Sequence, residues 1–287
     1  MDPSIEKIIY AIESLKQETS YFKDYLFPIV SALFTSILGA AIAYLTIRRQ
    51  ENIQIEKDKI TAANKWTLAA EQARTKLISI KHNYNGKLTK DPFQRVLTIP
   101  NIIFQANQIE ERYEDLSFIV PKSETKQDDK WPKWSQINRI SAMIGNYNHI
   151  LILWDKRNDL FQEFKDETSK KYPDSAFYDI DLEGVIEIMS LPKSAILIDL
   201  TERLIKLTDD ILIELDDFLS NFPKYVKSKI DVKRLKNFGT ILEYSHNGNA
   251  KLLSMLERMP EPDYSIVERL FGQPAEDIKK RHETGYE

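Results

Sequence analysis

The feature that most constrains this chain is a 23-residue segment without a charged side chain, Tyr25 to Ile47, which reads YLFPIVSALFTSILGAAIAYLTI. A helix rises about 1.5 Å per residue and the hydrocarbon core of a bilayer is roughly 30 Å thick, so about 20 residues suffice to cross it. Tyr25 and Tyr44 lie near its ends, where aromatic rings favour the headgroup layer. A buried helix of a soluble protein rarely runs this long without a charge. We therefore expect a transmembrane helix over residues 25–47.

The residues on either side of this segment predict its orientation. Ala41-Ile42-Ala43 has the form of a signal-peptide cleavage site, but the 24 residues before the apolar run carry five acids and three lysines, whereas a signal peptide starts with a short positive region. Arg48 and Arg49 then act as a stop-transfer flank. Within 20 residues of the span, basic residues number three before it and five after it. The positive-inside rule predicts an extracytoplasmic tail at 1–24 and a cytoplasmic C-terminal part.

The next segment, residues 48–85, is expected to continue the helix as a stem, because no Gly or Pro occurs between Ala40 and Asn85. Small and aliphatic residues recur along it at spacings of seven, three, seven and seven: Ile53, Ile60, Ala63, Ala70 and Leu77. Such a narrow seam suits a coiled coil between copies of the chain, and it suits equally a helix that packs on its own domain. The sequence NYNG at 83–86 is a credible end for the helix.

The remaining residues, 86–287, predict a helical domain. Eight glycines in 287 residues argue against a turn-rich β architecture. Apolar residues alternate in steps of three and four from Ile137 to Phe164, with Asn158 as the one polar position, and again from Leu197 to Phe222. The fold class is therefore all-α: a single N-terminal transmembrane helix that continues into a helical stem and a cytoplasmic helical bundle.

Smaller features divide this domain further. A short helix is expected near residues 182–189, and the chain after Pro260 is expected to be mobile. Prolines break helices because they lack an N–H and clash with the preceding turn. We expect helix ends near the prolines at positions 121, 132, 173, 192 and 223.

No sequence motif for catalysis or for a cofactor is present. The four histidines show none of the spacings of zinc enzymes, and there is no phosphate-binding glycine loop and no nucleophile elbow. His149 interrupts an apolar helix and is expected to lie in the core. The lack of cysteine excludes thiol catalysis and Cys-ligated zinc, and no disulfide framework argues for an oxidising compartment. We expect no catalytic residue, no metal and no cofactor.

Charged residues cluster at two places, although the chain as a whole is nearly balanced, with 40 basic and 44 acidic residues. Asp209-Asp210 and Asp216-Asp217 are spaced seven apart on the second long helix, as expected for a solvated acidic face. The following stretch, PKYVKSKIDVKRLKNF at 223–238, holds only one acid. The alternative interpretation of this basic stretch is a solvated face that opposes the acidic helix.

On a helix, Lys229, Lys233 and Lys236 would share one face, and the rings of Tyr225 and Phe238 flank the basic stretch. Such charge binds phosphate, and such rings stack on bases. The candidate ligand is therefore an anion such as a nucleotide or oligonucleotide. The candidate ligand-binding residues are Lys224, Tyr225, Lys227, Lys229, Lys233, Arg234 and Lys236.

A stripe of small residues follows one face of the expected span. Its members recur at steps of three and four: Ala32, Thr35, Ser36, Gly39, Ala40 and Ala43. Small side chains let helix backbones approach closely in lipid, so the stripe is a candidate surface for oligomerisation or for lining a pore. The alternative is that it reflects only the composition of membrane spans.

This organisation resembles that of the membrane effectors of bacterial antiphage systems, and in layout it is most similar to the channel-forming effector of the Hailong system. The resemblance covers the order of a short outer tail, one self-associating span, a stem and a helical domain, and no ligand-binding residue is carried over from it. It implies a homo-oligomer in the bacterial inner membrane that a nucleotide-derived ligand holds shut and infection opens. Two alternatives remain: a membrane-tethered scaffold or sensor that binds another cytoplasmic protein, and a membrane-tethered enzyme with an unrecognised site.

Overall fold

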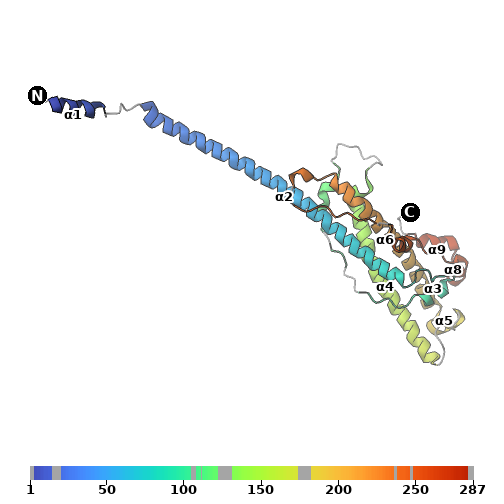
Figure 1. Cartoon of the computed structure of the whole chain (residues 1–287). Helices are drawn as coiled ribbons and strands as arrows, with labels where there is room; N and C mark the ends of the chain where they lie inside the picture. Colours follow the sequence, from blue (N-terminus) through green and yellow to red (C-terminus); the bar gives the residue numbers. More distant parts are fainter. Residues whose placement is uncertain are drawn as a thin grey trace. The chain divides into compact units, whose positions relative to one another are not determined.

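The structure is a computed structural model that describes residues 3–14, 21–104, 108–110, 112–121, 131–173, 182–235, 238–245 and 248–283. Within these residues the regular elements are helices, and no strand is formed (Figure 1). The expected all-α class is therefore confirmed. The α-helices are α1 (Pro3–Ser14), α2 (Phe27–His82), α3 (Pro92–Thr98), α4 (Ile137–Lys171), α5 (Leu182–Met189), α6 (Leu191–Lys227), α7 (Ala250–Leu256), α8 (Tyr264–Phe271) and α9 (Ala275–Arg281).

Short helical turns complete the inventory. A π-helical turn at Phe22–Leu26 precedes α2, and 3-10 turns lie at Tyr113–Ile119, Lys133–Ser135 and Val232–Arg234. The chain divides into two compact units, Met1–Ile55 and Glu56–Glu287. The boundary falls inside α2, so this one helix contributes to both units.

In the first unit, the described side chains up to Glu51 are all exposed within the chain. Among the described residues, one helical stretch, Phe22–His82, is long and apolar enough to cross a membrane, and its most apolar 18 residues have a mean hydropathy of 2.1 and no buried member. The expected apolar helix therefore exists as one continuous element, and its side chains find no partner surface in their own unit.

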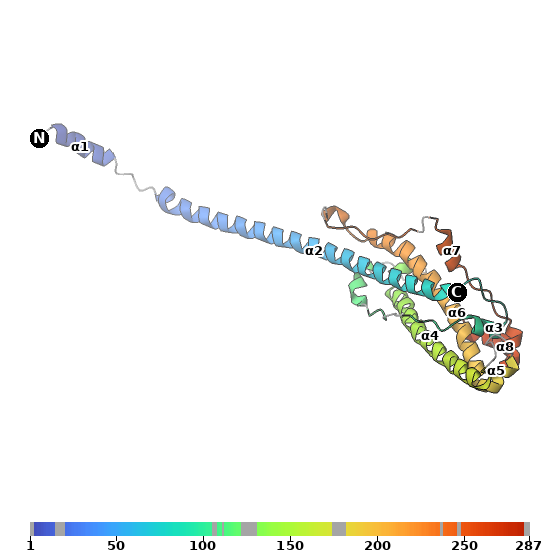
Figure 2. The same ribbon diagram turned by 60° about the horizontal axis from the view of Figure 1, so that its bottom comes forward.

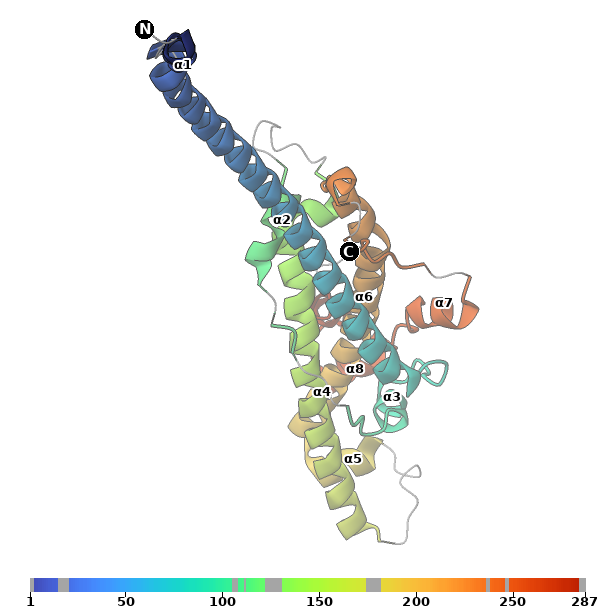
Figure 3. The ribbon, with the colours of Figure 1, turned by 60° about the vertical axis from the view of Figure 1, so that its left-hand side comes forward.

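In the second unit, α4 and α6 lie side by side and the second part of α2 lies along them (Figures 2 and 3). Both apolar series that the sequence predicts are buried: Trp154 on α4 and Leu204, Ile211 and Phe218 on α6 are inaccessible to solvent. The indole N–H of Trp154 donates to the Thr208 hydroxyl at 3.3 Å and fixes the register of α4 against α6. These two helices form the centre of the domain.

The stem is part of this domain from Glu56 onward. Ile60, Ala63, Ala70 and Leu77 are buried within the chain, together with Trp66, whose ring centroid lies 5.1 Å from that of Tyr113. Of the two packings left open by the sequence, the structure therefore forms the one in which this seam packs on its own domain. Helix α2 ends at His82, where the NYNG turn begins, and Gly86 adopts a positive φ of 73°.

A second apolar cluster lies where α3, α4, α5 and α6 meet. Its buried members are Val96, Phe161, Phe164, Met189, Leu197 and Ile198, and Leu270 of α8 packs against it. The predicted short helix at 182–189 is confirmed as α5. It brings Met189 into this cluster, although other side chains of the helix lie outside the described set.

The helix end predicted near Pro223 is wrong by one turn. This residue is inside α6, which continues to Lys227. A proline there removes the hydrogen bond to the carbonyl four residues earlier and crowds that turn, yet the helix continues for another turn, in which Val226 is completely buried. Packing of that side chain decides where the helix ends.

The expectation that the chain after Pro260 is mobile is also wrong, up to Glu283. Asp263 caps α8 by accepting from the Ser265 N–H at 3.0 Å, and Gly272 ends this helix in the left-handed conformation, with φ 61°. Val267 of α8 and Ile278 of α9 are fully buried. The helices are short and amphipathic, so their periodicity is difficult to recognise in sequence, and tertiary packing stabilises them.

Candidate functional site

The acidic pairs of α6 do not form the solvated face that their spacing predicts. Asp209, Asp210 and Asp216 are buried, and only Asp217 is half-exposed. A buried carboxylate requires a partner because desolvation of a lone charge is costly. Each of these residues pairs with a cation from another part of the domain: Asp209 with Lys81 (2.7 Å), Asp210 with Arg258, Asp216 with Arg74 (2.8 Å) and Asp217 with Lys133 (2.7 Å).

Two further carboxylates of α6 extend this series. Glu202 pairs with Arg95 of α3 at 2.8 Å, and both side chains are buried. Glu214 accepts from Lys133 at 2.7 Å and from Arg139 at 2.8 Å. The acidic side of α6 is thus an internal spine that binds cations from α2, α3, α4 and the C-terminal segment. These carboxylates are thus paired within the domain.

The basic stretch does not form the helical face that the sequence predicts. Helix α6 ends at Lys227, a turn follows, and only Val232–Arg234 forms a further 3-10 turn. Lys229 and Lys233, both exposed, therefore do not share a helical face. Lys236 lies outside the described residues, and so does the side chain of Arg234.

The other members of the stretch have partners in the chain. Lys227 pairs with Glu243 at 2.8 Å, and the positive charges of Lys227 and Lys224 lower the pKa of the Glu243 carboxyl, with the hydrogen bond from Lys227 as the largest cause. The Tyr225 hydroxyl donates to the Ile119 carbonyl at 2.7 Å, and the Lys229 amine lies 5.2 Å from the Tyr225 ring centroid. Phe238 lies under Lys57, 5.1 Å from its amine. The two rings are thus engaged within the chain.

The small-residue stripe lies on α2 with every member exposed: Ala32, Thr35, Ser36, Gly39, Ala40 and Ala43. The hydroxyls of Thr35 and Ser36 donate to the carbonyls of Ser31 and Ala32 at 2.7 and 2.8 Å, so they are satisfied inside the helix. A Cβ atom placed at Gly39 would meet no atom within 4 Å other than the backbone of its own helix. The stripe is therefore sterically open within the chain.

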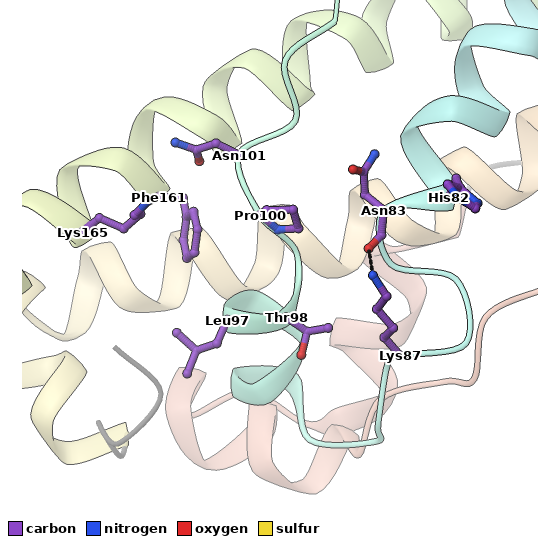
Figure 4. Close-up of a pocket in the computed structure, with 9 residues that line it drawn as sticks. All are labelled: His82, Asn83, Lys87, Leu97, Thr98, Pro100, Asn101, Phe161 and Lys165. Atoms are coloured by element: carbon purple, nitrogen blue, oxygen red, sulfur yellow. Dashed lines mark hydrogen bonds between the residues drawn. The ribbon is translucent and has the colours of Figure 1, made fainter. Parts of the chain in front are cut away.

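A pocket that the sequence does not reveal lies between three segments of the domain (Figure 4). It has a volume of about 540 Å³ and is lined by His82, Asn83 and Lys87 at the end of α2, by Leu97, Thr98, Pro100 and Asn101 at the end of α3, and by Phe161 and Lys165 on α4. This volume falls within the roughly 300–1,000 Å³ of small-molecule sites. None of the lining residues is acidic.

Helix α3 positions one wall of this pocket. Asp91 caps its start by accepting from the backbone N–H groups of Phe93 and Gln94 at 2.8 and 3.1 Å, and Pro92 occupies the first turn. At its end, Ile99 is extended because a residue before proline avoids the helical region, and Pro100 then directs the chain along α4. The wall is thus fixed by local sequence signals at both ends.

Arg157 of α4 anchors this wall through hydrogen bonds. Its guanidinium is buried and donates to the carbonyls of Val96 (2.8 Å), Ile99 (2.6 Å) and Pro100 (3.0 Å). These are carbonyls at the negative end of α3, which the cation satisfies. Burial lowers the pKa of Arg157 to about 9, so the group remains charged at neutral pH. The guanidinium also lies 4.3 Å from the Phe161 ring centroid.

The polar side chains at the pocket rim make fewer contacts within the chain than Arg157 does. The Lys87 amine donates to the Asn83 backbone carbonyl at 3.0 Å, which leaves two of its N–H donors available (Figure 4). Lys165 and His82 are exposed. Within the described part of the chain, no carboxylate lies within ion-pair distance of Lys87, Lys165 or His82.

The histidines differ from the sequence expectation. His149 is exposed on α4, so its predicted core position is wrong. His282, after α9, is the buried one, and its Nε2 lies 2.9 Å from the Asp199 carboxylate of α6. Burial alone would raise the pKa of Asp199, but the hydrogen bond and charge of His282 outweigh it and lower this pKa. Among the described residues no group of three potential ligands is placed to hold a metal ion.

Comparison with known proteins adds no relative: no protein family, curated protein or solved structure matches this chain.

Proposed function

We propose that this chain is a single-pass membrane protein that homo-oligomerises through its span and acts on the membrane itself, as an ion-channel-forming or membrane-disrupting effector of antiphage defence. In this proposal the N-terminus is outside, the helical domain is in the cytoplasm of a bacterium, and a ligand bound to that domain controls the activity. The alternative is a membrane-tethered scaffold or sensor without channel activity, and the experiments below separate the two.

The observation that carries the proposal is the exposure of the apolar part of α2. Phe34 and Leu33 are 66% and 61% exposed, and the most apolar window of the helix has no buried residue. Soluble monomers rarely expose a contiguous apolar surface above a few hundred Å². A helix that is apolar all round needs an apolar environment on every side, which lipid supplies.

The small-residue stripe supports association between spans. Gly39 is near the middle of the uncharged segment, and its position has no neighbour within 4 Å in the chain. Gly39→Leu therefore fits the isolated helix, and leucine is favourable in a bilayer, so insertion should be unaffected. If neighbouring copies meet at this stripe, the leucine separates their backbones and weakens the oligomer. The variant thus acts only on contacts between copies.

Ala41 provides a matched control, because a helix turns 100° per residue and Ala41 faces almost directly away from the stripe. Ala41→Leu adds the same kind of bulk to the opposite face. Crosslinked oligomer and membrane potential should be measured in the same cells for wild type, Gly39→Leu and Ala41→Leu. We expect Gly39→Leu alone to reduce oligomer and depolarisation in parallel.

Other results of this experiment would contradict specific parts of the proposal. Oligomer that persists in Gly39→Leu would show that the stripe is not the association surface. Oligomer that is lost while depolarisation persists would contradict the channel proposal. A wild-type protein that neither assembles nor depolarises cells when overexpressed would favour the scaffold.

Protease accessibility tests the proposed orientation. The three-to-five difference in flanking basic residues favours a cytoplasmic domain. Protease added to intact spheroplasts should therefore spare the domain, whereas protease added after lysis should digest its exposed loops. Digestion of the domain in intact spheroplasts would show that the protein has the opposite orientation.

A further inference from the structure

The pocket between α2, α3 and α4 differs in charge from the rest of the domain. Buried cations elsewhere are matched by acids: Lys81, Arg95 and Arg74 each pair with a carboxylate of α6. Around the pocket, Lys87 and Lys165 have no such partner among the described residues, and no acid lines it. The lining thus holds three basic side chains, those of His82, Lys87 and Lys165, and no acidic one.

The buried guanidinium under the pocket adds to this excess. The two terminal nitrogens of Arg157 donate to three carbonyls, and Arg157 has no carboxylate partner within the described residues, so its positive charge is not cancelled. It lies next to the lining residues Pro100 and Phe161, at 3.0 Å from the Pro100 carbonyl and 4.3 Å from the Phe161 ring centroid. A buried charge is screened by solvent far less than an exposed one. The pocket therefore has a buried positive charge next to its lining and two exposed amines at its rim.

The positions of the lining side chains indicate which kind of anion would fit this pocket. Figure 4 shows Lys165 and Lys87 on opposite sides, with Phe161 and Pro100 between them. Because the two amines lie on opposite sides of the pocket, a ligand with several phosphates can contact both of them. Leu97 and Pro100 supply an apolar wall for an organic group, and the Asn101 and Thr98 side chains supply hydrogen-bonding groups beside it.

We propose that this pocket binds an organic ligand that carries two or more phosphate groups, with the phosphates contacting Lys87 and Lys165 and the organic group against Leu97 and Pro100. His82 adds a further donor on the side of Lys87. Binding of such a ligand stands on this geometry alone, and its role as the control of the effector rests on the proposed function.

ATP, AMP and pyrophosphate, without magnesium, are suitable probes for calorimetric titration of the full-length protein in detergent. ATP should bind more tightly than AMP because it carries more phosphates, and more tightly than pyrophosphate because it carries an organic group. Affinity should fall with added salt, since the contacts are ionic. Binding of none of the three probes would overturn the proposal, and equal affinities for ATP and pyrophosphate would contradict the role of Leu97 and Pro100.

Charge reversal at the rim identifies the site. Hydrogen bonds to charged groups correspond to roughly tenfold to hundredfold in affinity each, so Lys87→Glu/Lys165→Glu should weaken ATP binding at least a hundredfold. Lys87→Arg/Lys165→Arg should retain most of the affinity. Lys156→Glu/Lys280→Glu makes the same change of net charge at two exposed positions outside the pocket and should leave binding within a few-fold of wild type.

The basic stretch is the competing site. Lys224→Glu/Lys229→Glu removes charge there and should leave ATP binding unchanged. Loss of binding in this variant, with binding retained in Lys87→Glu/Lys165→Glu, would overturn the proposal and assign the ligand to the basic stretch. Gly39→Leu separates this result from the proposed function, because it should bind ATP like wild type whether or not the protein forms a channel.

Discussion

The two parts of α2 differ in what surrounds them. From Phe27 to Ile55 the helix has no buried residue, whereas from Glu56 to His82 it has twelve. Both parts belong to one helix without an internal proline beyond its first turn, so backbone geometry does not separate them. The difference lies in the pattern of side chains.

From Phe27 to Ile47 the first part is uncharged and apolar on every side, whereas the second part is apolar along one seam. Ala63, Ala70 and Ala73 are fully buried, and such small side chains allow close approach of the neighbouring elements. Arg74 and Lys81 follow the same side and reach the carboxylates of α6. The second part therefore finds its environment within the chain, and the first part must find it outside. A segment that is apolar on every side and a segment that is apolar along one seam therefore require different environments, even within a single helix.

The largest expected effect comes from charging the first part. Phe34→Arg/Ile37→Arg places two guanidinium groups near the middle of the uncharged segment, and each costs about 2.5–3.5 kcal/mol at the centre of a membrane helix. The variant should leave the membrane fraction on carbonate extraction. Phe34→Leu/Ile37→Leu should remain. A double-arginine variant that still resists extraction would show that this part of α2 is not in lipid.

Removing a large side chain from each part should affect folding in only one of them. Trp66 is 1% exposed and packs on Tyr113, so Trp66→Ala should lower the free energy of unfolding by about 3–5 kcal/mol. Phe34→Ala should not change the unfolding of the domain. Urea unfolding of the full-length protein in detergent measures both. Equal shifts would contradict the division of α2 into two environments.

Removing one buried cation from the second part should have a smaller effect. Lys81 is fully buried, pairs with Asp209 at 2.7 Å and donates to the Glu257 carbonyl. Lys81→Met leaves Asp209 buried without its cation, which costs about 3–5 kcal/mol in general. We expect the lower end, about 3 kcal/mol, because Asp209 keeps the Met259 N–H at 2.7 Å.

The double variant Lys81→Met/Asp209→Asn tests this explanation, because a neutral amide still accepts the Met259 N–H and needs no cation. It should recover most of the lost free energy of unfolding. Lys76→Met, on the same helix, should cost less than about 0.5 kcal/mol. A double variant as unstable as Lys81→Met would show that lysine packing, and not charge pairing, stabilises this contact.

The smallest expected effect is a pH dependence at the other end of the domain. The pKa of Asp199 is lowered in the folded protein, against the effect of burial, by its contact with His282. A carboxyl with a lowered pKa stabilises the fold above its ordinary pKa, and this stabilisation is lost as the pH falls through the lowered value. The difference in melting temperature between wild type and Asp199→Asn should therefore be steady near pH 5 and shrink below about pH 4.

The exposed Asp159 serves as a control for the loss of one negative charge. Asp159→Asn should differ little from wild type over the same range. A melting difference for Asp199→Asn that does not change with pH would mean that the contact with His282 is a packing contact without ionic character.

Sequence periodicity predicts the long helices of this fold well. Most members of the series on α4 and α6 and of the seam of the stem are buried as their spacing indicates, because each pattern is contained in a single helix; Ile53, Ile137 and Leu200 are half-buried. Asn158, the one polar position in the α4 series, is also informative in retrospect: its amide accepts from the Ile102 N–H at 3.2 Å and donates to the Ile102 carbonyl at 2.8 Å. A polar residue in such a series indicates where an irregular segment packs.

Features that depend on partners distant in sequence are not predictable in this way. Asp210 and Asp216 are spaced like a solvated face, yet both are buried. Their burial depends on pairing with Arg258 and Arg74, which are distant in sequence. The pocket likewise combines residues around positions 82–87, 97–101 and 161–165, none of which forms a motif alone. The basic stretch stands out in sequence because its charges lie close together along the chain, yet α6 ends at Lys227, so these charges do not share one helical face.

The internal charge pairing of α6 also sets an order of events during synthesis, if the span enters the membrane as proposed. Asp210 pairs with Arg258, so the acidic spine is not complete until that arginine has left the ribosome. The span ends at Ile47, and at roughly 5–20 residues per second the ribosome needs roughly 10–40 s to synthesise the chain between these two positions. Insertion therefore precedes folding, and the domain assembles its core while already tethered to the bilayer. Copies made from one message are then tethered to the same surface while their domains are still incomplete.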